Sequence, residues 1–131
     1  MDNKKVILIT EDEIKLRSIL RNKLEASGFT VFEAKNGEEG LEITERENPD
    51  LILVDIVMPK MDGIEMLKKL RENEKNNKIK FIILTNVDST EKIAEAMKIA
   101  QTANDPSFEY FIKTDVKLED IVKKVLEKLS V

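Results

Sequence analysis

The sequence predicts an α/β fold in which helices cover both faces of a parallel sheet. Five short apolar runs alternate with stretches that have helical periodicity. Three of these runs, at residues 6–9, 51–54 and 81–84, are apolar throughout and do not alternate with polar residues. Unbroken apolar character indicates strands that are buried on both faces, as in a doubly wound parallel sheet. The 131 residues, of which 41% are hydrophobic, are enough for one domain with its own core.

Strand and helix are expected in the order βα, repeated five times. The strands are VILI at 6–9, TVFEA at 30–34, LILV at 51–54, FIIL at 81–84 and FEYFI at 108–112. Apolar stripes at helical spacing predict the intervening helices. The most regular stripe lies in the last helix and consists of Leu118, Ile121, Val122, Val125, Leu126 and Leu129. Candidate helix N-caps are Asp12, Asn36, Asp88 and Asp115, and Gly28 is expected to end the first helix.

Composition excludes several classes of function. The chain has no cysteine, so disulfides, thiol nucleophiles and thiolate metal sites are absent. It has no histidine either, which excludes Ser-His-Asp triads and imidazole zinc sites. The 22 basic and 26 acidic residues are interleaved, giving a net charge of -4 and no basic patch for nucleic acid. No apolar run is long enough to span a membrane, so we expect a soluble, cytoplasmic protein without direct nucleic-acid or membrane contacts.

The stretch LILVDIVMPKMDG, residues 51–63, carries an acid where the third strand should end. A carboxylate in that position is desolvated, and therefore costly, unless another group pairs with it. In a parallel sheet the carboxyl ends of the strands lie at one edge, where ligands bind. The polar residues expected at that edge are Glu11 and Asp12 after the first strand, Asp55 after the third, Thr85 after the fourth and Lys113 after the fifth. Each alone has a purely structural explanation, but together they suggest a site.

The chemistry of these side chains fits phosphoryl transfer assisted by a metal ion. Neighbouring carboxylates raise one another's pKa unless a cation neutralises them, and Mg²⁺ prefers carboxylate oxygens together with water and a phosphate oxygen. Glu11, Asp12 and Asp55 are therefore candidate metal ligands. Lys113 and Thr85 offer a positive charge and a hydroxyl for the equatorial oxygens of a transferring group. Asp55 is the candidate nucleophile, because a carboxylate can form an acyl phosphate.

The segments TEDE, LILVDIVMPKMDG, ILTN and YFIK together resemble the CheY-like receiver domains of two-component response regulators, from about Val6 to Leu129. The resemblance implies a flavodoxin-like (βα)5 sheet of strand order 2-1-3-4-5 and a single receiver domain over residues 1–131, with no output domain. It implies that a histidine kinase or phosphotransfer protein delivers the phosphoryl group to Asp55, and that an effector protein docks downstream. By the same resemblance, the main-chain carbonyl of Val57 joins Glu11, Asp12 and Asp55 as a Mg²⁺ ligand, Thr85 contacts the phosphoryl group, Lys113 pairs with Asp55, and Tyr110 is the switch aromatic.

The sequence departs from the usual receiver pattern at four places. Glu11 stands where most relatives have an aspartate, Asn86 where a small residue is usual, and Thr114 where proline usually follows the lysine. Without proline, we expect a trans peptide between Lys113 and Thr114, or else a strained cis bond held by the site. The segment 101–108, QTANDPSF, is about five residues longer than usual, and its role is open.

Two other interpretations share this fold. A flavin-binding domain needs a Ser/Thr/Gly-rich loop after the first strand, whereas TEDE would repel the FMN phosphate. A pseudo-receiver would keep the fold and act only as an interaction module. The presence of Asp55, Thr85 and Lys113 disfavours it, and a test for an acyl phosphate would decide.

Overall fold

The computed structural model describes residues 4–86, 90–101 and 109–129 of the chain. Five strands form one parallel sheet of order β2-β1-β3-β4-β5, as expected. The strands are β1 (Val6–Thr10), β2 (Thr30–Ala34), β3 (Leu51–Val54), β4 (Lys80–Thr85) and β5 (Tyr110–Ile112). The helices are α1 (Ile14–Ala26), α2 (Gly37–Glu47), α3 (Gly63–Arg71), α4 (Thr90–Ala100) and α5 (Leu118–Leu129), with a short 3-10 helix, η1 (Glu74–Lys78), before β4.

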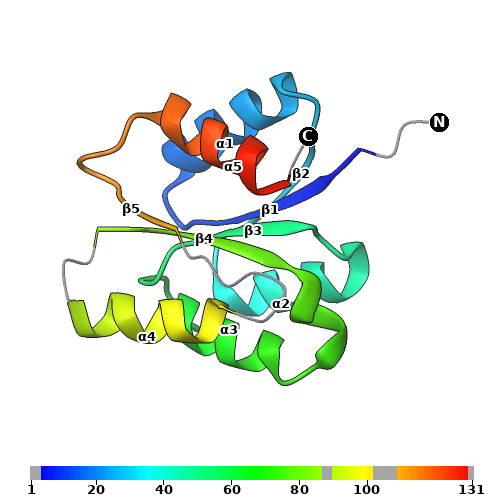
Figure 1. The fold of residues 1–131 in the computed structure, drawn as a ribbon, viewed down its shortest axis with the longest axis vertical. Helices are drawn as coiled ribbons and strands as arrows, with labels where there is room; N and C mark the ends of the chain where they lie inside the picture. Colours follow the sequence, from blue (N-terminus) through cyan, green and yellow to red (C-terminus); the bar gives the residue numbers. More distant parts are fainter. Residues whose placement is uncertain (1–3, 87–89, 102–108, 130–131) are drawn as a thin grey trace.

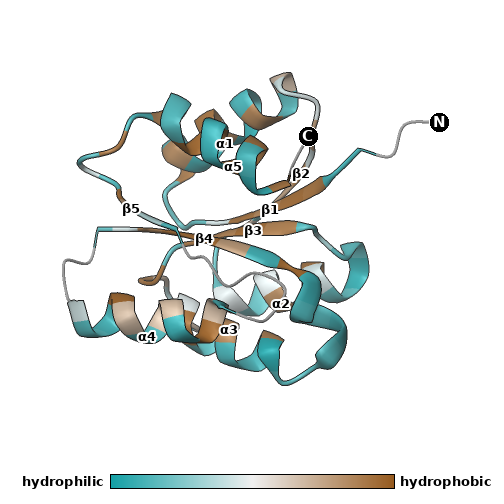
Figure 2. Cartoon of the chain, viewed as in Figure 1, coloured by the Kyte–Doolittle hydropathy of each residue, from teal (hydrophilic) through white to brown (hydrophobic). Residues whose placement is uncertain are grey.

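The helices lie in two layers on either side of the sheet. Figure 1 shows α1 and α5 on one face and α2, α3 and α4 on the other. Alternate residues of the central strands belong to two separate hydrophobic cores. Leu8 and Ile52 pack toward α2, α3 and α4, whereas Ile7 and Leu53 pack toward α1 and α5. The hydropathy colouring of Figure 2 follows this arrangement, with brown strands between helices whose outer surfaces are largely teal. The continuously apolar strands are thus buried on both faces, as predicted.

Helix ends agree only partly with the predicted caps. The Asn36 side chain accepts a hydrogen bond from the Glu39 amide and caps α2, and Gly28, with φ +100°, follows the end of α1. The caps predicted at Asp12 and Asp115 are wrong, because α1 begins after Glu13 and α5 begins only at Leu118. Both acids stand too early in the chain to reach the first free amides of their helices. The cap predicted at Asp88 lies outside the described residues.

One acid was not recognised as a cap. Asp62 accepts a hydrogen bond of 2.8 Å from the Glu65 amide and begins α3. It is the aspartate of the segment MPKMDG, so this cap places the start of α3 directly behind the end of β3.

Arg71, the last residue of α3, joins several elements at the sheet edge where the strands begin. Its guanidinium donates hydrogen bonds to four main-chain carbonyls, those of Asn76, Ile79, Ile99 and Ala100. It also lies 4.6 Å from the ring centre of Phe81 in β4. The carboxyl-terminal end of α4 is therefore fixed to α3, η1 and the start of β4. In the part of the chain that the structure describes, no helix is long and apolar enough to cross a membrane.

Candidate functional site

The carboxyl ends of four strands bring the predicted site residues to one edge of the sheet. Glu11 and Asp12 follow β1, Asp55 follows β3, Thr85 ends β4 and Lys113 follows β5. Main-chain hydrogen bonds continue between strands at this edge, from the Asp55 amide to the Thr10 carbonyl (3.2 Å) and from the Lys113 amide to the Thr85 carbonyl (2.9 Å). The positions of Asp55 and Lys113 are thus fixed by the sheet rather than by free loops.

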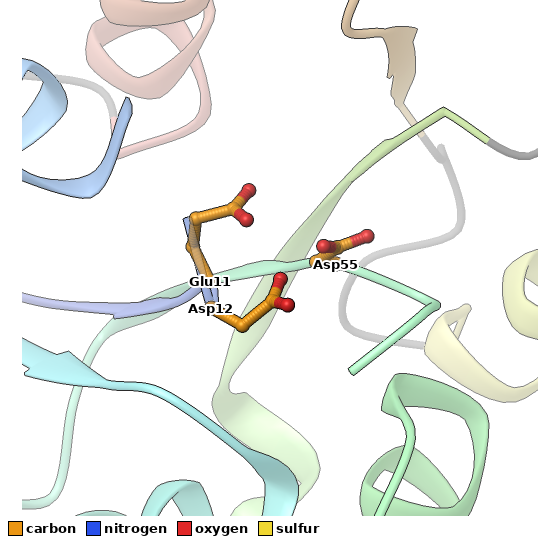
Figure 3. A group of neighbouring side chains, drawn as sticks. All are labelled: Glu11, Asp12 and Asp55. Carbon is orange, nitrogen blue, oxygen red and sulfur yellow. The ribbon is translucent and has the colours of Figure 1, made fainter. Parts of the chain in front are cut away.

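Three carboxylates form the centre of the site. One oxygen each from Glu11, Asp12 and Asp55 lies within 4.8 Å of the other two, and Figure 3 shows the three side chains grouped at the ends of β1 and β3. Glu11 is 1% exposed and Asp55 is 3% exposed, whereas Asp12 is open to solvent. Two of the three acids have therefore lost most of their contact with water.

Lys113 supplies the partner that the buried acids require. Its Nζ lies 2.6 Å from Oε1 of Glu11 and 2.9 Å from Oδ2 of Asp55. The second oxygen of each acid accepts a main-chain hydrogen bond, from Val57 to Asp55 Oδ1 (3.3 Å) and from Glu13 to Glu11 Oε2 (3.0 Å). The peptide after Lys113 is trans, as expected for a lysine followed by threonine.

The pKa values in this cluster reflect burial opposed by pairing. Burial raises the pKa of Glu11 to about 7, and the nearby Asp55 charge adds to this, although the Lys113 ammonium lowers it. Burial likewise raises the pKa of Asp55 against the effect of Lys113. Burial disfavours the charged form of Lys113, but its two carboxylate partners outweigh this and raise its pKa. Both buried acids thus carry negative charge less readily than in water.

The donor set fits a hard divalent cation. Oε1 of Glu11 is buried and accepts no well-formed hydrogen bond from the described residues, its one close cationic contact being the Lys113 ion pair. A Mg²⁺ ion favours a few carboxylate oxygens with its remaining ligands from water or phosphate, and it would lower the cost of holding three carboxylates together. The role of the Val57 carbonyl as a fourth ligand stays a prediction.

A cavity of about 530 Å³ opens over the acids. It is lined by Asp12, Glu13, Asp55, Val57, Asn86 and Lys113. Thr85 is completely buried and lies outside this lining, so its predicted contact with a phosphoryl group stays a prediction. Val57 is 54% exposed and Tyr110 is 44% exposed. Val87 and the segment 102–108 lie outside the described residues.

Gly63, the first residue of α3, packs against the main chain of Asp55. A Cβ atom added at Gly63 would lie 2.2 Å from the Asp55 carbonyl oxygen. The Gly63 amide also donates a 2.9 Å hydrogen bond to the Ile56 carbonyl. The glycine of MPKMDG therefore permits α3 to support the acid from behind, a role that the sequence interpretation missed. The lining residue Glu13 was also not assigned a role of its own.

Comparison with known proteins agrees with this geometry. The family model described as "Response regulator receiver domain" matches residues 7–126. The chain is 35% identical to sporulation initiation phosphotransferase F of Bacillus subtilis, over 92% of each chain. It is 36% identical to the alkaline phosphatase synthesis transcriptional regulatory protein PhoP of the same organism, over 98% of this chain, and spans about half (51%) of that protein's length.

A solved CheY-like receiver domain from Methanospirillum hungatei superposes with a TM-score of 0.83 at 28% identity, over 98% of this chain and 95% of that one. The sheet order, the acidic edge with its lysine, and a family match over most of the sequence all lead to one assignment. The chain belongs to the response regulator receiver domain family of two-component systems.

Proposed function

We propose that this receiver accepts a phosphoryl group on Asp55, with Mg²⁺ held by Glu11, Asp12, Asp55 and the main-chain carbonyl of Val57. The observation that supports this most directly is the setting of Asp55. It is a 3% exposed carboxylate that lines a cavity, 2.9 Å from an ammonium and grouped with two more acids. An ion pair with a purely structural role needs one acid for one base, so the surplus of acid at this edge favours a site for a cation.

In the proposed reaction a carboxylate oxygen of Asp55 attacks the phosphorus of an acyl phosphate or a phosphohistidine. A new P–O bond forms, the bond from phosphorus to the donor breaks, and the donor's carboxylate or imidazole departs with the electron pair. The metal ion, when bound, neutralises charge on the oxygens of the transferring group. Lys113 adds a positive charge beside Asp55, and Thr85 is proposed to donate its hydroxyl to a phosphoryl oxygen.

Labelling with acetyl phosphate tests the proposal. We expect one phosphoryl group per chain with Mg²⁺, none in EDTA, and none for Asp55→Asn. Asp62→Asn is the matched control, because Asp62 lies seven positions further on and asparagine caps a helix as well as aspartate does. Equal labelling of Asp55→Asn and wild type would refute the assignment of Asp55. A chain that binds no phosphoryl group under any condition would instead be a pseudo-receiver.

The proposed partners are a histidine kinase or phosphotransfer protein as donor and an effector protein as target, in the cytoplasm. We propose that the effector docks on the surface of α4, β5 and α5, because Tyr110 is half-exposed there and β4, which ends at Thr85, lies between β5 and the Asp55 strand β3. Phosphorylation replaces the single negative charge of the Asp55 carboxylate with the roughly -1.5 to -2 charge of a phosphoryl group. Amide shifts on adding a phosphoryl mimic should extend to this surface, and shifts confined to the loops around Asp55 would contradict the proposal.

No catalytic activity beyond self-phosphorylation and slow self-dephosphorylation is proposed for this chain. Some relatives are DNA-binding or transcriptional regulators, and the expectation that this receiver itself does not contact nucleic acid stays a prediction. Phosphotransfer profiling against the histidine kinases of the host would identify the donor.

A further inference from the structure

A network of two arginines and one glutamate lies directly behind the acidic loop. Arg17 of α1 donates from Nε to Oε1 of Glu33 in β2 (2.9 Å) and from Nη1 to the main-chain carbonyl of Glu11 (2.8 Å). Arg21, one turn later, donates to the other oxygen of Glu33 (2.5 Å). The side chains of Arg17 and Glu33 are only 16% and 23% exposed. Arg17 is therefore held at one end by Glu33 and holds the Glu11 carbonyl at the other.

The carbonyl that Arg17 binds belongs to the peptide between Glu11 and Asp12. That peptide connects two of the three clustered acids, so its orientation sets where both side chains begin. Two further hydrogen bonds fix Glu11. Its main-chain amide donates to the Ala34 carbonyl (2.9 Å), and its Oε2 accepts from the Glu13 amide (3.0 Å). Among these contacts, the guanidinium supplies the hydrogen bond to the carbonyl.

Glu33 keeps the guanidinium of Arg17 in place. Burial disfavours the carboxylate, but Arg21 and Arg17 outweigh it and lower the pKa of Glu33. A guanidinium presents Nε and Nη1 as a rigid fork, which one ammonium group cannot reproduce. The register of the sheet places Ile9 of β1 opposite Glu33, so the network joins β2 and α1 to the end of β1.

We propose that Arg17 is a positioning residue of the metal site, fixing the Glu11–Asp12 peptide so that both carboxylates face the cation. This inference rests on the proposed function, because it assumes that the acids bind Mg²⁺. Groups that orient metal ligands without touching the metal commonly change metal affinity by roughly 10–100-fold when removed.

Simple electrostatics makes the opposite prediction, so the sign of the effect is informative. Arg17 carries a positive charge behind three acids, and its removal alone should strengthen the binding of a cation. Positioning requires instead that its removal weakens binding. The conservative variant Arg17→Lys keeps the charge but loses the fork, so electrostatics predicts no change for it and positioning predicts weaker binding.

The experiment is a titration of the full chain with Mg²⁺ alone, followed by amide chemical shifts and by calorimetry. We expect the Kd of Arg17→Ala and Arg17→Lys to rise by roughly tenfold. The matched control is Arg21→Ala, which also removes an arginine from Glu33. The side chain of Arg21 donates its hydrogen bonds to Glu25 and Glu33 and not to Glu11. We expect its Kd to stay within about twofold of wild type. In the metal-free proteins, the amide signals of Asp12 and Glu13 should shift in both Arg17 variants and not in Arg21→Ala.

Urea unfolding in EDTA separates positioning from loss of stability. If Arg17→Ala and Arg21→Ala lose similar stability but differ in Kd, positioning is supported. Unchanged or tighter binding by the Arg17 variants, or equal weakening in all three, would overturn it. If Arg17→Ala does not fold, Arg17→Lys decides by the same comparison. A wild-type protein that binds no Mg²⁺ would overturn the proposed function as well, whereas normal binding and labelling with unaffected Arg17 variants would overturn this inference alone.

Discussion

Replacing Gly63 with alanine tests how closely the start of α3 supports Asp55. The added Cβ would lie 2.2 Å from the Asp55 carbonyl oxygen, 3.0 Å from its carbonyl carbon and 2.8 Å from Cγ1 of Val54. Carbon–oxygen contacts are usually about 3.3 Å or longer. The main chain at Asp55 or the first turn of α3 therefore has to move by about 1 Å. The hydrogen bond from Gly63 to Ile56 resists that movement.

The expected magnitude follows from this overlap. Overpacking a close contact costs about 1–3 kcal/mol, and the better helix propensity of alanine offsets at most ~1 kcal/mol. We expect Gly63→Ala to lower the free energy of unfolding by about 1–2 kcal/mol. Reacting groups need to be held to about 0.5 Å, so a shift of ~1 Å at Asp55 should slow labelling by acetyl phosphate at least roughly tenfold.

Urea unfolding and the initial rate of labelling with Mg²⁺ measure the two effects. Gly28→Ala is the control, because Gly28 has φ +100° and no atom within 4 Å of its added Cβ. That variant should be destabilised by about 1–3 kcal/mol through backbone strain and should label at the wild-type rate. Wild-type stability and wild-type labelling in Gly63→Ala would show that the contact with Asp55 is relieved without displacing the acid.

Three further predictions concern a strained loop residue, the ion pairs of Glu33 and the lifetime of the phosphorylated state. Lys60 has φ +65°, so Lys60→Gly should raise the free energy of unfolding by up to about 1 kcal/mol in urea titrations; a loss of stability would contradict this. The pKa of Glu33 is lowered from 4.5, since its two arginine partners outweigh burial. The contribution of Glu33 to the free energy of unfolding is therefore present above pH 4.5 and is lost as the pH falls through the lowered pKa. Glu33→Gln should cost about 0.5–1 kcal/mol at pH 7 and progressively less as the pH falls below 4.5, and a pH-independent difference would refute this reasoning. The apolar, half-exposed Val57 and the equally apolar Val87 should keep water from phosphorus, giving a half-life of many minutes or longer after donor removal. Val57→Asn with Val87→Glu should shorten it, and a half-life of seconds in wild type would show that these valines do not control the water.

The fold was largely predictable because the strands that are buried on both faces are apolar throughout. Leu51–Val54 is buried at every position. In a chain of this length, a short run that is apolar throughout fits few structures other than a strand covered on both faces. The site was predictable for a related reason. Once the sheet is parallel, the residue after each strand must lie at one edge, which brings Lys113 to Asp55 although 58 positions separate them.

Contacts that depend on side-chain direction were harder to predict. Asp12 and Asp115 are of a residue type that often caps helices, but an aspartate caps a helix only when the helix begins directly after it. The bond from Arg17 to the Glu11 carbonyl could not be predicted, since an arginine on an amphipathic helix usually points to solvent. The one signal for this contact in the sequence is the i, i+4 spacing of Arg17 and Arg21 in α1. Both arginines form ion pairs with Glu33 of strand β2.

The hydrogen bonds of Arg71 make one end of α4 a pivot. The guanidinium binds the carbonyls of Ile99 and Ala100, at the opposite edge of the sheet from the acids (Figure 1). The helix of 11 residues is about 16 Å long, so a tilt of roughly 10° about this pivot would carry Thr90 through about 3 Å and leave Ala100 almost still. A displacement of α4 near the acids would therefore be largest at Thr90 and would decline along the helix toward Ala100. Distance probes for such a motion belong at the Thr90 end, with Ala100 as the fixed reference.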